Sequence, residues 1–434
     1  MGNLSSFSKK LYLKYSSPST LVLVVLLCIP LSYAFNSISL GLLTLATLIT
    51  FKKENLKFDL NLILPILLYL IMLISISWTI DFDRTTNALS KELPLFLIPT
   101  CFLLFRPIST LEKDKIMKWF SYGIVAYSIF YLIKALIRYT ISFDSSVFFY
   151  HELVTKDVNA IHVSVYVAIA FFNFFVKPKK SFFDQFAVGL LFLMVFLLSS
   201  KNIIVVFIGL IVCYHLFFTK TSKKLRLKNI ILLLVFLISL TFIGEIKKRF
   251  QEEYETIMTD SSINDVVSKG NGTVYNVSIK QAWNNPVFKQ NDYLPGTAFR
   301  VYQTRIFIEM LHENNIFWNG FGLDASYSKI NEKGIQYNLF LGDETKEGYQ
   351  KKNFHNQYIQ IFAELGIFGL LLLLTMLFIS LRNAINNNFV QIAFSLLMLS
   401  LFLTESFLWR QRGVTFFILM YCIFNSNSEK RISN

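Results

Sequence analysis

Long apolar runs are the feature that most constrains this chain. Stretches of mostly apolar residues recur along most of its 434 residues, for example at 60–79 and at 357–381. A helix needs about 20 predominantly apolar residues to cross the hydrocarbon core of a bilayer, and soluble domains interrupt such runs sooner. We therefore predict an all-α fold, a polytopic transmembrane bundle of about 12 spans with one large, partly helical loop.

The composition supports a membrane protein and excludes several other classes. Hydrophobic residues make up 54% of the chain and charged residues only 16%, whereas a soluble domain carries about 25% charged residues. A soluble enzyme and a disordered chain are thereby disfavoured. The four cysteines lie inside apolar runs without a CxxC motif, so we expect neither a disulfide framework nor a zinc site.

The distribution of basic residues predicts the orientation of the spans. Lysine or arginine clusters precede the first predicted span and follow the second, fourth, sixth and eighth, and such clusters mark cytoplasmic loops. Both termini are then cytoplasmic, and the net charge of +14 reflects orientation rather than nucleic-acid binding. The predicted spans are 20–36, 37–51, 60–79, 92–106, 116–140, 158–176, 184–200, 201–219, 229–245, 357–381, 389–406 and 413–426.

Three regions follow from this pattern. Residues 1–245 form an N-terminal transmembrane bundle of about nine spans, 246–356 form a large periplasmic loop, and 357–434 hold the last spans and a cytoplasmic tail. The loop is polar, with a helical patch at Thr304–Leu311. A loop of this length without any structure is uncommon unless it is functional, so we expect it to cover the bundle and to carry site residues.

Polar groups at the end of this loop are candidates for chemistry. His355-Asn356-Gln357-Tyr358 stands where the chain re-enters the membrane, and Glu364 follows within the span. A neutral histidine can accept a proton near pH 7, but His355 could also be an interfacial cap. Glu364 must face protein or water, whereas Gly366 and Gly369 could simply allow close helix packing.

Basic residues on the same predicted side are candidates for binding an anion. Arg300 and Arg305 lie in the loop, and arginine suits phosphate because its donors form a fork. Lys201 follows Ser200 between two apolar runs, where a lysine could equally snorkel to the interface. Lys91 and Arg410 lie on other outer segments. Since no HExxH, P-loop or GxSxG motif is present, we expect a reaction without metal or cofactor on an anionic, membrane-borne substrate.

The order of these motifs resembles a known family. Arg300, Gly320-Phe321-Gly322, His355-Asn356-Gln357-Tyr358 and Glu364-Leu365-Gly366-Ile367-Phe368-Gly369 are similar to the signature region of the O-antigen ligase and O-antigen polymerase superfamily. Members are bacterial inner-membrane proteins of about twelve spans with one large periplasmic loop. Asn315 and Thr304 stand where the family often has Pro and Trp, so the chain looks like a divergent member.

The resemblance implies roles for individual residues. His355 would be the general base, and Arg300 would bind the diphosphate of a lipid-linked donor with Arg305 as a helper. Lys201 stands where the family usually has an arginine after a serine, and a lysine cannot grip phosphate through two donors. We expect supporting roles for five further residues, which are Lys91, Glu364, Asn356, Tyr358 and Arg410.

The resemblance also implies a reaction and its partners. The chain would transfer a glycan from undecaprenyl diphosphate onto a periplasmic acceptor such as lipid A–core, with inversion at the anomeric carbon. Its partners would be that donor, a glycan acceptor and membrane lipids, not nucleic acid. Three alternatives stay open, namely a repeat-unit polymerase of the same superfamily, a polysaccharide or lipid transporter, and a non-catalytic membrane scaffold. Charges concentrated at one face disfavour a transporter.

Overall fold

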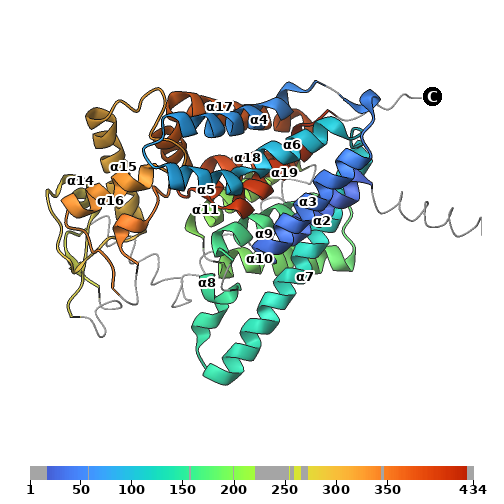
Figure 1. Ribbon diagram of the computed structural model, residues 1–434. Helices are drawn as coiled ribbons and strands as arrows, with labels where there is room; N and C mark the ends of the chain where they lie inside the picture. Colours follow the sequence, from blue (N-terminus) through green and yellow to red (C-terminus); the bar gives the residue numbers. More distant parts are fainter. Residues whose placement is uncertain are drawn as a thin grey trace, which may run out of the picture.

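Helices make up most of the computed structural model, which describes residues 17–56, 58–155, 158–198, 200–219, 254, 259–264, 272–343 and 347–427. Most of them form one bundle, and a smaller group covers one end of it (Figure 1). The bundle helices are α2 (Pro18–Cys28), α3 (Tyr33–Ile49), α4 (Leu60–Ile74), α5 (Phe82–Glu92), α6 (Pro94–Leu104), α7 (Thr110–Ser142), α8 (Tyr150–Leu153), α9 (Ala160–Phe175), α10 (Phe182–Leu197), α11 (Lys201–Cys213), α17 (Gln357–Asn387), α18 (Phe389–Leu401) and α19 (Gln411–Asn425).

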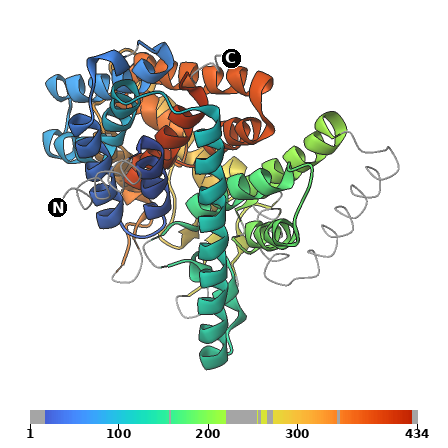
Figure 2. The ribbon, with the colours of Figure 1, turned by 90° about the vertical axis from the view of Figure 1, so that its right-hand side faces the viewer.

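The outer surface of the bundle is apolar, as a lipid-facing surface must be. On α3, Ile38, Leu42 and Leu45 are all more than half exposed, and α7 projects from the bundle as a long rod (Figure 2). Leaving such residues exposed to water is unfavourable, whereas lipid accepts them. Within the described residues, five segments are long and apolar enough to cross a membrane: Leu60–Ser77, Phe82–Leu104, Thr110–Ser142, Lys201–Phe218 and Gln357–Ile385. The chain is a membrane protein.

Helices occupy the predicted spans, apart from the ninth at 229–245, which lies outside the described residues. Several boundaries were wrong. The first break falls at 29–32, where Pro30 cannot continue a helix, and not at 36–37. The fourth span begins earlier than predicted, because α5 and α6 follow one another with only Leu93 between them. A single turn of π-helix, Tyr214–Phe218, follows α11.

Short polar side chains set where the bundle helices begin. Ser109 and Glu112 form a reciprocal capping box at the start of α7, and Ser181 and Asp184 form another at α10. Each box satisfies backbone N–H groups that have no partner inside the helix. Asn388 caps α18 in the same way through its side-chain oxygen. Each of these caps begins a new helix after a polar connection between two apolar runs.

The large loop forms a compact cap at one end of the bundle (Figure 1). Its main helix, α15, spans Gly296–Glu313. It begins eight residues before the start of the predicted helical patch. The cap has its own hydrophobic core, separate from that of the bundle, around Tyr302, Phe288 and Phe354. Its other elements are β1 (Ser262–Ile263), β2 (Tyr275–Asn276), α14 (Ile279–Asn284), β3 (Asp292–Tyr293), α16 (Ser326–Gln336) and a 3-10 turn at Tyr349–Lys351.

The cap also departs from the expected all-α fold. Its three two-residue strands form a small sheet in the order β1-β2-β3. β1 pairs with β2 in the antiparallel sense, and β2 pairs with β3 in the parallel sense. Ser262 pairs with Asn276, and Tyr275 pairs with Asp292. Segments this short carry no alternating apolar pattern in the sequence, and they are stabilised by the cap around them. The sheet places β2 and β3 against the pocket described below.

The two ends of the bundle differ in the residues they carry. At the end away from the cap, Asn61 donates to the carbonyl of Asn425 and Lys113 to that of Ser426. The last described residues therefore lie beside the basic loops at 52–59 and 106–115. The start of α11 lies at the cap end, together with the loop between α18 and α19. The basic loops and the cap thus lie at opposite ends of the bundle.

Candidate functional site

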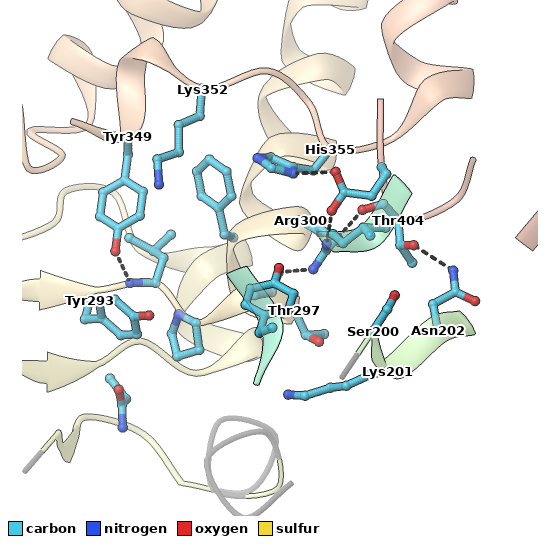
Figure 3. Close-up of a pocket in the computed structure, with 18 of the residues that line it drawn as sticks. Ser200, Lys201, Asn202, Tyr293, Thr297, Arg300, Tyr349, Lys352, His355 and Thr404 are labelled. Carbon is cyan, nitrogen blue, oxygen red and sulfur yellow. Dashed lines mark hydrogen bonds and ion pairs between the residues drawn. The ribbon is translucent and has the colours of Figure 1, made fainter. Parts of the chain in front are cut away.

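A pocket of about 580 Å³ lies between the cap and the bundle (Figure 3). Its walls come from segments far apart in the sequence, including the start of α11, the start of α15, the end of the cap and the loop between α18 and α19. Among the described lining residues, three carry a full positive charge and one is a carboxylate. These four are Lys201, Arg300, Lys352 and Glu405.

Arg300 lies in the first turns of α15 and reaches across to the bundle. Its Nε donates to the carbonyl of Thr404 at 2.8 Å, and its two terminal nitrogens contact the carbonyl of Gly296 and Oε1 of Glu405 at 3.0 and 3.2 Å. A guanidinium has five N–H groups, so these three bonds leave one N–H on each terminal nitrogen. Arg300 therefore keeps two N–H donors beyond the contacts that hold it.

His355 is held in the pocket by a carboxylate and by its own backbone. Its Nδ1 lies 3.4 Å from Oε2 of Glu405, and its ring meets that of Phe299 edge to face. The backbone of His355 has a φ of +48°, which is unfavourable for a residue with a Cβ, and its N–H donates to the side chain of Asn353. These contacts orient the ring with Nδ1 toward Glu405.

Glu405 connects the two predicted site residues. One of its oxygens faces Arg300 and the other faces His355. The loop that carries it is fixed to α11, because Asn202 donates to the Ser400 carbonyl at 2.7 Å and to Thr404 at 2.6 Å. Lys201, the residue before Asn202, is the first residue of α11 and lines the same pocket. Bundle and cap thus meet at one polar centre.

Arg305 was predicted to help bind phosphate, but the structure places it away from the pocket. It lies inside the cap, where its donors contact Oε1 of Glu309, the carbonyl of Asn285 and the hydroxyl of Tyr337 at 3.0, 2.8 and 2.9 Å. Lys333 joins this network through Glu309 and Glu313. Arg305 therefore has a structural role, because its donors hold parts of the cap together.

Asn356 and Tyr358 likewise do not line the pocket, although they are close to His355 in sequence. Asn356 is the N-cap of α17, and its side-chain oxygen accepts from the N–H groups of Tyr358 and Ile359. The hydroxyl of Tyr358 donates to the carbonyl of Leu399 on α18 at 2.9 Å. Both residues fix the start of α17 and so the position of His355.

Glu364 and Lys91 line a second, much smaller cavity. Glu364 accepts hydrogen bonds from Gln360 and Ser326, and it shares this space with Glu92 and Asp324. Lys91 lies over the ring of Trp409 at 5.3 Å. Arg410 is exposed at the start of α19 and lines neither cavity. The structure therefore separates these three predicted supporting residues from His355.

The glycine motifs prove to be a backbone junction. α17 is kinked at Gly366, whose φ is +65°, and the segment 317–322 packs along the kink. Gly322 N–H donates to the Glu364 carbonyl at 2.9 Å, and Ile367 N–H donates to the Phe317 carbonyl at 2.9 Å. A Cβ on Gly366 would overlap the Trp318 carbonyl, and one on Gly320 would overlap Glu364. Close packing, the role expected for Gly366, accounts for these contacts.

Sequence reasoning missed two residues of the pocket. Neither Glu405 nor Lys352 was assigned a role from the sequence. Neither belongs to a motif, and Glu405 meets Arg300 and His355 only because segments 105 and 50 positions away in the sequence come together. Inside the described ranges, no group of three or more His, Cys, Asp or Glu residues is placed to hold a metal ion.

Comparison with known proteins finds one family match. The O-antigen ligase family model matches residues 186–374, which include α11, the cap and the kinked part of α17. Over these residues the chain is similar to the O-antigen ligase family, which supports membership of that superfamily. The match ends before Glu405, so the family model covers Arg300 and His355 but not the carboxylate that joins them. No curated protein matches the chain.

The matched family indicates the general type of activity. Its members are O-antigen ligases and polymerases, so this chain has the character of a glycosyltransferase that works on a lipid-linked glycan and a glycan acceptor. The prediction of the family from the motif order is confirmed.

Proposed function

We propose that the pocket binds a polyprenyl-diphosphate-linked glycan and transfers the glycan onto an acceptor hydroxyl, with His355 as the general base. The observation that carries this proposal is the placement of a histidine, a carboxylate and the cations Lys201 and Arg300 in one pocket at the end of a membrane bundle. A lipid-linked substrate reaches such a pocket with its tail in the bilayer and its diphosphate at the membrane surface.

Arg300 and Lys201 hold the diphosphate in this proposal. The two remaining N–H groups of Arg300 suit two oxygens of one phosphate, and Lys201 adds charge from the membrane side of the pocket. The leaving lipid diphosphate carries extra negative charge in the transition state, so fixed cations lower the barrier. Glu405 keeps Arg300 in place, because it bonds to the same guanidinium.

His355 supplies the proton acceptor. Glu405 faces Nδ1 and so favours the tautomer that carries a hydrogen there, which leaves the lone pair on Nε2 for the acceptor hydroxyl. The acceptor oxygen forms a bond to C1 of the donor sugar, and the bond from C1 to the diphosphate oxygen breaks. The hydroxyl proton moves to Nε2. A single displacement of this kind inverts the anomeric carbon, and it needs no cofactor.

The finer assignment within the superfamily is to an O-antigen ligase of the bacterial inner membrane that uses lipid A–core as acceptor. The alternative is a repeat-unit polymerase, whose acceptor is a second lipid-linked unit. The glycans of a deletion strain separate them. A strain that lacks all polymer on lipid A–core, while lipid-linked polymer accumulates, supports the ligase. A single repeat unit on the core supports the polymerase, and unchanged glycans contradict both.

Orientation can be tested independently. We propose that both termini are cytoplasmic and that the cap and pocket are periplasmic, because the basic loops lie at the end opposite the cap. Reporter tags after residue 52 or 180 should then report the cytoplasm, and a tag between 272 and 290 should report the periplasm. A cytoplasmic report from the tag in the cap would place the pocket on the wrong side for a periplasmic acceptor.

A further inference from the structure

Lys352 is a cation of the pocket for which the reaction described above has no use. It follows the 3-10 turn at the end of the cap and precedes His355 by three residues. Its Nζ lies 5.5 Å from the ring centre of Tyr349, and it has no carboxylate partner among the described residues. The next lysine back, Lys351, is exposed and does not line the pocket.

Lys352 lies on a different wall from the proposed diphosphate site. In Figure 3, Lys352, Tyr349 and Tyr293 lie on one side of the pocket, and Ser200, Lys201 and Asn202 lie on the other, with Arg300 and His355 between. We call Tyr293, Tyr349 and Lys352 the cap wall. Lys201 begins a membrane helix, whereas the cap wall belongs entirely to the large loop. A lipid anchor keeps the diphosphate near the membrane, so only the sugars can reach the cap wall.

The cap wall is built to hold Lys352 in position. The hydroxyl of Tyr349 accepts the backbone N–H of Leu294 at 3.0 Å, and its ring packs against Phe299. The ring is therefore fixed, and its face supports the ammonium group through a cation–π contact. Tyr293, on β3, adds a partly exposed aromatic side chain to the same wall. A cation fixed beside aromatic rings suits an anionic group on a ring-shaped ligand.

From this arrangement we propose that the cap wall is a subsite for an acidic sugar, with Lys352 paired to a carboxylate or phosphate on the glycan. The inference rests on the proposed function, because it takes the ligand of this pocket to be a saccharide. It adds a chemical class that the family does not specify. The lining supports it by charge, since three cations face one carboxylate, and Glu405 already serves Arg300 and His355.

Binding of soluble glycans tests the subsite without any transfer reaction. The purified full-length protein is titrated calorimetrically with a tetrasaccharide that contains glucuronic acid, and with the same tetrasaccharide after its carboxyl groups are reduced to alcohols. We expect the acidic form to bind roughly three- to tenfold more tightly, as for a partly exposed ion pair. Lys352→Gln should abolish this preference, and Lys352→Arg should keep it. Lys351→Gln, the matched control, should also keep it.

A third probe separates a sugar contact from a phosphate contact. Undecaprenyl diphosphate without a glycan should bind Lys352→Gln as tightly as it binds the original protein. Weaker binding of this probe to Lys352→Gln would make Lys352 part of the diphosphate site and overturn the proposal. Equal affinity for the acidic and reduced tetrasaccharides, or binding of neither, would overturn it as well. A protein that prefers the acidic glycan but never transfers one would support the subsite and contradict only the proposed function.

Discussion

Glu405 and His355 face one another across the junction of bundle and cap, with Oε2 of the carboxylate 3.4 Å from Nδ1 of the ring. They are 50 positions apart in the sequence and come from different helix connections. The same carboxylate binds Arg300 through its other oxygen. One side chain thus sets the position of both the proposed base and the proposed phosphate ligand.

Replacing His355 tests the base directly. We expect His355→Gln to lower the rate of glycan transfer by roughly 10²–10⁴-fold, because an amide keeps a hydrogen bond but cannot accept the proton. Donor binding should persist, since the cations are unchanged. The measurement is transfer of a labelled glycan by purified protein. His312→Gln, a change at an exposed histidine of the cap, is the control and should leave the rate unaltered. A near-normal rate for His355→Gln would reduce His355 to a structural cap.

A double-mutant cycle tests whether Glu405 acts through His355. Glu405→Gln should lower the rate by roughly 10–10³-fold, by analogy with carboxylates that orient a catalytic histidine. In a protein that already carries His355→Gln, the same change should lower the rate much less, because the effects of substitutions at coupled residues are not additive. Glu405→Asp should recover part of the rate. Fully additive losses would show that Glu405 acts independently of the histidine.

Variants of Arg300 and Arg305 distinguish a loss of phosphate binding from a loss of stability. Arg300→Lys keeps the charge but loses the fork of donors, so we expect a barrier higher by about 2–4 kcal/mol with normal protein abundance in the membrane. Arg305→Lys should instead lower the melting temperature, because Arg305 ties Glu309, Asn285 and Tyr337 together inside the cap. Rates and melting temperatures of the two variants are compared. A normal rate for Arg300→Lys would leave Arg300 as a loop charge.

The kink of α17 predicts a strong effect of a single methyl group. At Gly366 the φ of +65° is unfavourable for alanine, and a Cβ would overlap the Trp318 carbonyl. We expect Gly366→Ala to destabilise the protein by more than about 1 kcal/mol, seen as a lower melting temperature and lower abundance. Gly41→Ala on α3, where a Cβ meets nothing within 4 Å, should be tolerated. Equal stability of the two variants would contradict the observed junction.

Acid should weaken the cap through Glu309. Burial raises the pKa of this carboxyl, but hydrogen bonds from Tyr337, Lys333 and Arg305 outweigh it, so the pKa lies below its ordinary value of 4.5. Its contribution to stability is then complete above about pH 4.5 and is lost as the pH falls through the lower folded-state pKa. Melting temperature is followed from pH 7 to about pH 3.

Two variants identify the group responsible for that acid dependence. Glu309→Gln should be less stable at pH 7 and should lose less stability on acidification than the original protein does. Glu332→Gln should keep the original pH dependence, because Glu332 is an exposed residue paired with Lys329. An unchanged pH dependence in Glu309→Gln would assign the acid effect to other carboxyl groups.

Much of the architecture could be predicted because it depends on local composition. Apolar runs must become helices in a membrane, since a bilayer offers no hydrogen-bond partner for the backbone. Polar residues such as Asn388 mark where one helix ends and the next begins. The polar stretch at 246–356 marked the large loop, and the order of its motifs indicated the family. His355 and Arg300 could be selected because few other side chains can act as a general base or bind phosphate through a fork of donors.

The tertiary structure decided which of the polar residues meet. Arg300 and Arg305 are five residues apart on α15, yet one reaches the pocket and the other packs the cap, because the two side chains leave the helix in different directions. Lys201 and Glu405 of the bundle converge with Arg300 and His355 only through the docking of the cap on the bundle. Contacts between such distant segments depend on how whole elements pack, and no local pattern in the sequence encodes that packing.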